Sequence, residues 1–228
     1  MPTINSFIRF LHASPGTPSV DIYTDGNLAV KNLAYNELSE YLVTGPEDMH
    51  IQLFSAGKTE NPLLDTTLTI PPSEAITAAI IGTLPDISLL PIFVNVVPRD
   101  NDDALIRFTN LSPALTDADL AIEDGATLFS NVGYTQVTDY EIIPPGSYTL
   151  RLRNAKGDDS VLASGSIEIE PRTAYTVYAI GLTEDEPPLQ IGFYSDLIPN
   201  ISNQVKETVF RKDTSFGSQA PRINLFYE

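Results

Sequence analysis

The sequence predicts an all-β protein built from two tandem β-sandwich domains. Three observations support this fold class. The chain repeats itself, short stretches alternate apolar and polar residues, and turn signals separate these stretches at a spacing of roughly ten residues. Hydrophobic residues make up 42% of the chain, which is enough for each repeat to build a core of its own.

The repeat is the most informative feature. The stretch "FIRFLHASP" at Phe7–Pro15 returns as "LIRFTNLSP" at Leu105–Pro113. Further matches are "DGNLAVKNLAYNELSEY" (25–41) with "DGATLFSNVGYTQVTDY" (124–140), "MHIQLFSAG" (49–57) with "YTLRLRNAK" (148–156), "LTIPPSEAITAAIIG" (68–82) with "IEIEPRTAYTVYAIG" (167–181), and "LLPIFVN" (89–95) with "PLQIGFY" (188–194). We therefore predict domains over 1–97 and 105–196, an acidic linker over 98–104, and an unmatched C-terminal tail over 197–228.

Strands are predicted from the period of two in "IRFLHAS", "VDIYTDG", "MHIQLFSA" and "YTLRLRN". Asp25-Gly26 and Asp124-Gly125 supply the positive φ that tight hairpins require. The apolar stretch "AITAAIIGTL" (75–84) has the length of a buried strand and is too short to cross a membrane. We expect seven or eight strands in each domain.

Charge and composition exclude several classes of function. Lys and Arg number 13 against 30 Asp and Glu, so the net charge is −17, which argues against nucleic-acid partners and anionic membranes. The absence of cysteine excludes disulfides, thiolate zinc sites and cysteine nucleophiles. The N-terminus lacks the basic and apolar regions of a signal peptide, and we expect no membrane insertion.

His12, Ser14 and Asp21 lie close together in the sequence and raise the hypothesis of a hydrolase. The second copy keeps Ser112, Pro113 and Asp119 but has Asn110 in place of the histidine. No G-x-S-x-G elbow is present, and Pro15 ends strand pairing directly after Ser14. We therefore expect the retained residues to be architectural, with Ser and Asp side chains bonded to turn backbone, and we predict no catalytic residue and no cofactor-binding residue.

Calcium is the one cofactor that the sequence raises. The linker contains Asp100, Asp102 and Asp103, and Asp119 could add another carboxylate, which suits the oxygen ligands that Ca²⁺ prefers. No EF-hand spacing is present, and a hydrated linker is the alternative reading of these residues.

Four tyrosines and the tail complete the set of candidate features. Tyr35 and Tyr41 return as Tyr134 and Tyr140, and we expect buried rings whose hydroxyls bond backbone. The tail (197–228) carries apolar residues, and "RINLFYE" has β character. We expect it to pair with an exposed sheet edge, in its own chain or in a neighbour, and a disordered end is the alternative.

One further pattern runs through both copies. It includes His12, Ala13, Ser14, Pro15, Asp21, Asp25, Gly26, Tyr35 and Tyr41 in the first copy, and Pro145, Gly146, Tyr175, Thr176, Val177 and Gly181 in the second. This pattern resembles the bacterial domain-of-unknown-function family 4397, in two tandem copies. The resemblance implies an immunoglobulin-like or transthyretin-like sandwich without established enzymatic activity. It favours a cell-surface or secreted location, and the missing signal peptide leaves a cytoplasmic one open.

These observations favour a non-enzymatic structural or adhesive module of a bacterial cell envelope or surface layer. Its expected partner is another protein or a second copy of itself, bound through the tail or edge strands. The alternatives are a ligand- or Ca²⁺-binding module acting at the domain junction and, with less support, a hydrolase.

Overall fold

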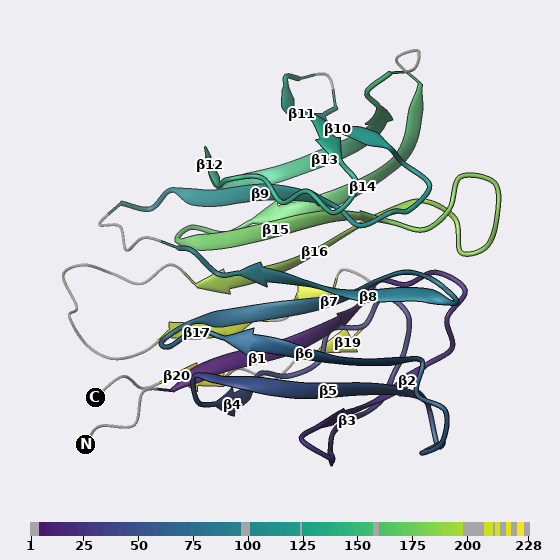
Figure 1. Ribbon diagram of the computed structural model, residues 1–228. Helices are drawn as coiled ribbons and strands as arrows, with labels where there is room; N and C mark the ends of the chain where they lie inside the picture. Colours follow the sequence, from purple (N-terminus) through teal and green to yellow (C-terminus); the bar gives the residue numbers. More distant parts are fainter. Residues whose placement is uncertain are drawn as a thin grey trace. The chain divides into compact units, whose positions relative to one another are not determined.

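The computed structural model describes residues 5–96, 101–123, 125–156 and 160–197, together with the backbone of four short strands between 208 and 225. All elements described are β-strands and turns, so the predicted all-β class is confirmed (Figure 1). The chain divides into two compact units, Met1–Val94 (unit 1) and Asn95–Glu228 (unit 2).

Unit 1 is a sandwich of two four-stranded sheets, ordered β4-β1-β7-β8 and β3-β2-β5-β6. All pairings are antiparallel except that β1 runs parallel to β7. The strands are β1 (Ser6–His12), β2 (Val20–Thr24), β3 (Asn27–Leu33), β4 (Leu42–Thr44), β5 (Glu47–Ser55), β6 (Leu64–Ile70), β7 (Ala75–Thr83) and β8 (Asp86–Phe93).

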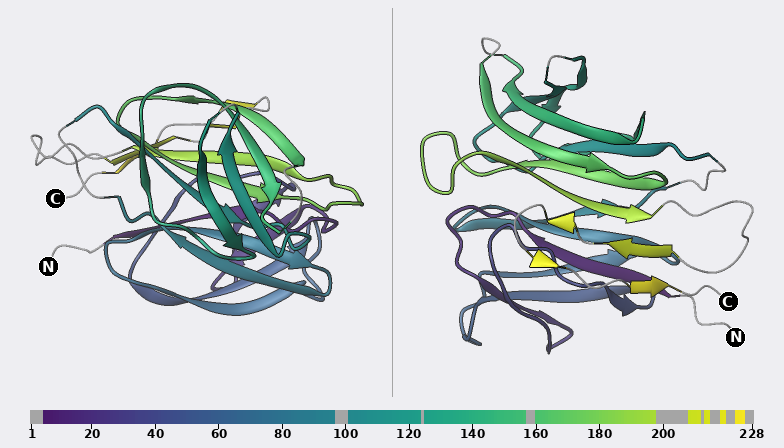
Figure 2. Two further views of the ribbon diagram at one scale, coloured as in Figure 1. Left: turned by 90° about the horizontal axis from the view of Figure 1, so that it is seen from above. Right: turned by 180° about the vertical axis from the view of Figure 1, so that it is seen from behind.

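Unit 2 repeats this topology strand by strand, with sheets ordered β12-β9-β15-β16-β17-β20 and β11-β10-β13-β14. The strands that correspond to those of unit 1 are β9 (Ala104–Asn110), β10 (Asp117–Ile122), β11 (Thr127–Gly133), β12 (Glu141–Ile143), β13 (Gly146–Asn154), β14 (Val161–Ile169), β15 (Thr173–Ile180) and β16 (Gln190–Leu197). The long hairpin of β13 and β14, drawn in green, can be followed in both views of Figure 2.

The tail continues the larger sheet of unit 2. Strand β17 (Thr208–Arg211) pairs with β16 through Ser195 and Asp196, and β20 (Ile223–Leu225) pairs with β17. The strands β18 (Asp213–Thr214) and β19 (Ser218–Gln219) form a separate two-stranded pair. The described backbone of the tail thus forms strands that extend the sheet beyond β16. In unit 1 the corresponding strand, β8, is the last strand of its sheet.

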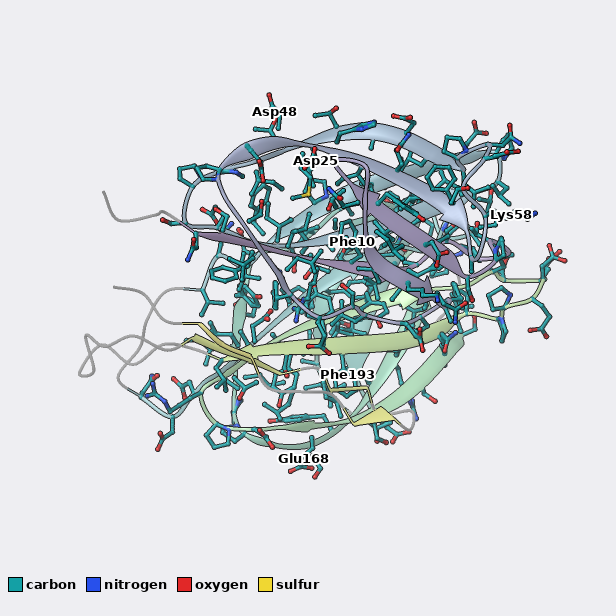
Figure 3. The ribbon with its side chains drawn as sticks, turned by 90° about the horizontal axis from the view of Figure 1, so that it is seen from below. Phe10, Asp25, Asp48, Lys58, Glu168 and Phe193 are labelled. Carbon is teal, nitrogen blue, oxygen red and sulfur yellow. The ribbon has the colours of Figure 1, made fainter. Side chains whose placement is uncertain are left out.

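Each unit has its own apolar core between its sheets. The core of unit 1 includes Phe10 of β1, and that of unit 2 includes Phe108 at the matching position of β9. Figure 3 shows Phe10 within the unit, whereas Asp48 and Lys58 project from its surface. The central strands β1, β7, β9 and β15 are buried on both faces over most of their length, which explains their nearly continuous apolar sequences.

The last predicted match between the repeats is wrong by several residues. In β8, Pro91 lies opposite Ala78 of β7, and in β16 it is Phe193 that lies opposite the corresponding Val177 of β15. Pro91 therefore corresponds to Phe193, and not to Gln190 as the sequence match implied. The cause is a longer hairpin in unit 2, where residues 181–189 separate the two strands, against residues 84–85 in unit 1.

Candidate functional site

In unit 1, His12 and Ser14 lie at the corner where β1 ends, and both are buried. The His12 ring bonds at both nitrogens: Nε2 lies 3.1 Å from the Pro18 carbonyl oxygen, and Nδ1 accepts the Ser14 N–H at 3.4 Å. This pattern assigns a neutral ring whose Nε2–H donates to Pro18. Burial lowers the pKa of His12 below its usual value, while the Pro18 carbonyl and Glu37 oppose that shift.

The hydroxyl of Ser14 is directed away from the histidine ring. Its Oγ donates to the Gly82 carbonyl at 2.7 Å and lies 2.7 Å from Oγ1 of Thr17. A catalytic serine needs its hydroxyl bonded to the histidine that acts as base. The hydroxyl instead fastens the corner to the end of β7.

Unit 2 builds the same corner with Asn110 in place of the histidine. The Asn110 side-chain amide donates to the Leu115 carbonyl at 2.9 Å, and its Oδ1 accepts the Ser112 N–H at 3.2 Å. Ser112 Oγ donates to the Gly181 carbonyl at 2.7 Å, as Ser14 does to Gly82. An amide and a neutral imidazole therefore both accept the N–H of the corner serine and donate to carbonyls of the following turn, although the carbonyls are not at matching positions, and Asn110 also donates to Val132.

Both corner prolines follow their serines in the turn, with Pro15 buried and Pro113 partly buried. The aspartates Asp21 and Asp119 lie on β2 and β10, and their carboxylates bond backbone N–H groups instead of the hydroxyls of Ser14 and Ser112. Asp21 accepts the N–H of Asn32 and that of Gly57, each at 2.7 Å, and Asp119 accepts the N–H of Asn131 at 2.7 Å.

The asparagines that these aspartates hold have left-handed backbones, with φ of 53° at Asn32 and 55° at Asn131. Asn adopts this conformation more readily than most residues. Each carboxylate stabilises the resulting bend in the neighbouring strand because it accepts the N–H of that asparagine. The three residues that suggested a hydrolase are thus bonded separately to backbone in the described structure.

Each unit also contains a buried arginine that the sequence analysis did not single out. Arg9 Nε donates to Thr77 Oγ1 at 2.9 Å, and Arg107 Nε donates to Thr176 Oγ1 at 2.9 Å. The Arg9 guanidinium lies 4.4 Å from the centre of the Tyr41 ring. The Arg107 guanidinium lies at the same distance from the Tyr140 ring, a geometry favourable to cation–π attraction.

This arrangement gives the repeated tyrosines different surroundings. Burial raises the pKa of Tyr140, although the positive charge of Arg107 opposes the rise. Tyr35 packs edge-on against His12, with ring centres 6.0 Å apart, and Tyr134 forms a single β-bridge with Asn110. The signal for the arginine was present in the sequence, since a charge in the middle of an apolar strand recurs in "IRF" of both repeats.

The calcium candidates are not gathered into one site in the described residues. Asp100 lies outside those residues. Asn101 donates its side-chain amide to Asp103, whereas the Asp119 carboxylate holds the Asn131 backbone. Asp102 is exposed. Where side chains are described, no group of three or more His, Asp or Glu residues has an arrangement that could hold a metal ion.

One polar cluster lies on the exposed face of unit 1. His50 Nε2 lies 2.7 Å from Oδ1 of Asp65, and Gln52 donates its amide to Oδ2 at 2.7 Å. The hydrogen bond from His50, followed by that from Gln52, lowers the pKa of Asp65. This is a solvated hydrogen-bond network across β5 and β6.

Comparison with known proteins gives a family, and one likeness among solved structures supports no conclusion. No helix in the described part of the chain has the length and apolar character that a membrane crossing needs. The chain is similar at 12% identity to the crystal structure of the module CBMbc (family CBM26) from Eubacterium rectale Amy13K in complex with maltoheptaose, over 82% of this chain and 95% of that one. The TM-score of 0.28 is too low for this likeness to support any conclusion. No curated protein matches the sequence.

The family model described as "Domain of unknown function (DUF4397)" matches residues 6–121 and again residues 116–206. The first match covers unit 1 and continues through β9 into β10, and the second begins just before β10 and passes the end of β16. The chain belongs to the DUF4397 family and contains it in two tandem copies.

Proposed function

We propose that this protein is a non-catalytic structural or adhesive module of a bacterial cell envelope or surface layer, which assembles with further copies of itself through its sheet edges. The observation that carries the proposal is an exposed apolar side chain at the same edge position in both units. Val43 of β4 is 66% exposed and Ile142 of β12 is 56% exposed.

These two residues occupy equivalent places in the sandwich. Val43 lies opposite Phe7 of β1, and Ile142 lies opposite Leu105 of β9. Strands β4 and β12 are the first strands of their sheets, so among the described residues no strand pairs with the backbone groups on their outer sides. A sheet edge with an exposed β-branched side chain favours pairing with another chain.

The bonding of the polar residues supports a non-catalytic role. His12, Ser14 and Asp21 are buried, and their polar atoms bond backbone groups that fix the corner and the bend. In unit 2 the bonds of Ser112 to Asn110 and Gly181, and of Asp119 to the Asn131 N–H, match those of unit 1, which supports an architectural task in each copy.

The test measures mass in solution over a range of protein concentration, by light scattering behind size exclusion. The double variant Val43→Lys/Ile142→Lys places charges on both edges and is expected to reduce a concentration-dependent assembly to the monomer. Leu28→Lys is the matched control, because Leu28 is also an exposed apolar residue (46%) on an edge strand but has Thr127 at its position in unit 2.

A wild-type chain that remains monomeric at all concentrations contradicts the proposal. So does an assembly that the double variant leaves unchanged, or one that Leu28→Lys weakens equally. A chain ending at Leu197 tests the tail separately, and assembly that depends on the tail alone would assign the contact to β17 and β20 instead of the edges.

A further inference from the structure

Unit 2 contains a pocket at a place where unit 1 has different residues. The pocket lies between β14 of one sheet and β16 of the other, and its volume is about 270 Å³. Its apolar lining comes from Leu150, Ile167, Ile191 and Phe193. All four are core residues of unit 2, so the pocket gives access to the apolar layer between the two sheets.

A glycine in the middle of β14 creates part of this space. Gly165 lies opposite Leu150 in the β13–β14 ladder, and the corresponding residue of unit 1 is Thr66, opposite Ile51. A Cβ atom at Gly165 would have Ile191 as its nearest neighbour, at 3.7 Å, which is an ordinary contact. The surroundings would therefore accept a Cβ atom at this position, so crowding does not explain why residue 165 is a glycine.

The rim of the pocket is polar but uncharged. Ser164 and Ser166 flank Gly165 and share the exposed face of β14 with Glu168, so they border the opening with their backbone groups and not with their hydroxyls. Gln190 begins β16. Glu168 of the same strand is outside the lining, and Figure 3 shows it pointing away from the ribbon. An uncharged rim around an apolar floor suits a neutral ligand, because an ion would lose hydration without gaining a partner.

Backbone groups add hydrogen-bonding capacity at the same place. Strand β14 is the last of its sheet, and within the described structure it pairs only with β13. Strand β16 pairs with β17 only at Ser195 and Asp196, so along Gln190–Phe193 its outer edge carries no ladder in the described part of the chain. Two strand edges therefore border the opening.

We propose that this pocket is a binding site for a small, neutral ring compound with one hydroxyl group. The volume equals about nine molecules of liquid water at ~30 Å³ each, which fits one six-membered ring with a short substituent. The ring contacts the four apolar side chains, and the hydroxyl remains at the rim, where backbone groups along the edges of β14 and β16 can bond it. A sugar fits poorly, because hydroxyls around its ring would face apolar side chains unpaired.

The test is a titration of the ¹⁵N-labelled full chain with phenol, followed by amide chemical shifts, with methyl glucoside as the comparison ligand. We expect phenol to shift the amides of Gly165 and Ile191, and methyl glucoside to leave them in place. Gly165→Thr introduces the side chain of unit 1 and is expected to weaken phenol binding at least tenfold. Glu168→Gln, on the exposed side of the same strand, is the matched control and should change affinity less than twofold.

Amide shifts elsewhere in the spectrum report whether Gly165→Thr keeps the native fold, and Gly165→Ala provides a smaller filling if it does not. No saturable phenol shifts at Gly165 and Ile191 would overturn the proposal, as would equal binding to Gly165→Thr and wild type. Binding of methyl glucoside at the same amides would overturn the assigned ligand class.

Discussion

The corners that follow β1 and β9 perform one structural task with two different side chains. In unit 1, His12 joins the Pro18 carbonyl to the Ser14 N–H, and in unit 2 Asn110 joins the Leu115 carbonyl to the Ser112 N–H. Both serines then bond the carbonyl of a glycine at the end of the neighbouring strand.

The comparison teaches that the histidine is interchangeable in geometry but not in charge. An imidazole and a carboxamide each offer a donor and an acceptor, so either can close the corner. Only the imidazole can bind a proton near neutral pH, and protonation would remove the acceptor that receives the Ser14 N–H. We therefore expect the corner of unit 1, and not that of unit 2, to be sensitive to acid.

The largest effect is expected from the glycines that receive the serine hydroxyls. A Cβ at Gly82 would lie 2.2 Å from the Asp86 carbonyl oxygen, and one at Gly181 would lie 2.1 Å from that of Pro188. Both residues also have positive φ. Gly82→Ala and Gly181→Ala should each cost about 3–5 kcal/mol in the free energy of unfolding, measured in urea.

Gly45→Ala is the control for these two variants, because nothing lies within 4 Å of a Cβ at Gly45. We expect it to change stability by less than about 0.5 kcal/mol. A cost at Gly82 or Gly181 no greater than that of the control would mean that the close approach of the hairpin backbone is not needed.

The buried arginines are expected to rank second. Arg9→Ala and Arg107→Ala remove a hydrogen bond to threonine and the packing against a tyrosine ring, and each should cost about 2–4 kcal/mol by urea unfolding. Thr77→Val and Thr176→Val retain the side-chain shape and remove the hydrogen bonds of the threonine hydroxyl, which for Thr176 include one with Tyr140. Full stability in the alanine variants would assign these arginines no structural role.

The serines test whether the two corners are fastened equally. Ser14→Ala and Ser112→Ala each leave a glycine carbonyl without its hydroxyl partner, at a cost of about 1–2 kcal/mol in thermal or urea unfolding. Each hydroxyl has a second bond, at 2.7 Å to Thr17 Oγ1 for Ser14 and at 3.3 Å from the Ala114 N–H for Ser112, so the shorter bond should make the cost in unit 1 the larger one. The opposite ranking would break the parallel between the corners.

Alternation and the internal repeat were enough to predict the two sandwiches, because a period of two fixes which residues face a core. The same period misled the final match, since a strand shifted along an alternating pattern still looks correct. Only pairing revealed that the longer hairpin aligns Phe193 with Pro91. A sequence match in which both segments are apolar therefore locates a strand but not its register.

The candidate site was predictable in part. The missing histidine in the second copy directed attention to turns, but the partners of the corner lie far away in sequence, as with Ser14 and Gly82. The pocket depends on two strands of different sheets, and no local pattern reports which strands meet across a sandwich. Gly165 was visible as a glycine within a strand, and its significance required Thr66 as a structural counterpart.

The smallest effect at neutral pH is expected from exchanging the corner residues. His12→Asn places in unit 1 the residue that unit 2 has at this corner. We expect the free energy of unfolding, measured in urea at pH 7, to fall by about 1 kcal/mol or less. Asn110→His should transfer acid sensitivity to unit 2. A severe loss of folding in His12→Asn would show that the imidazole has a task beyond its two hydrogen bonds.

The central claim is tested by hydrogen exchange at two equivalent amides. Ala13 N–H donates to the Ile80 carbonyl and Leu111 N–H to the Ala179 carbonyl, each at 2.9 Å. The protection factor of the Ala13 amide divided by that of the Leu111 amide therefore compares the two corners within one molecule. Because the pKa of His12 is lowered in the folded state, the unfolded corner binds more protons, and its stability falls as pH drops below about 6.5. Between pH 7 and pH 5 the ratio should fall in the wild type and stay constant in His12→Asn. A wild-type ratio that does not change with pH, or an equal fall in the variant, would contradict the account.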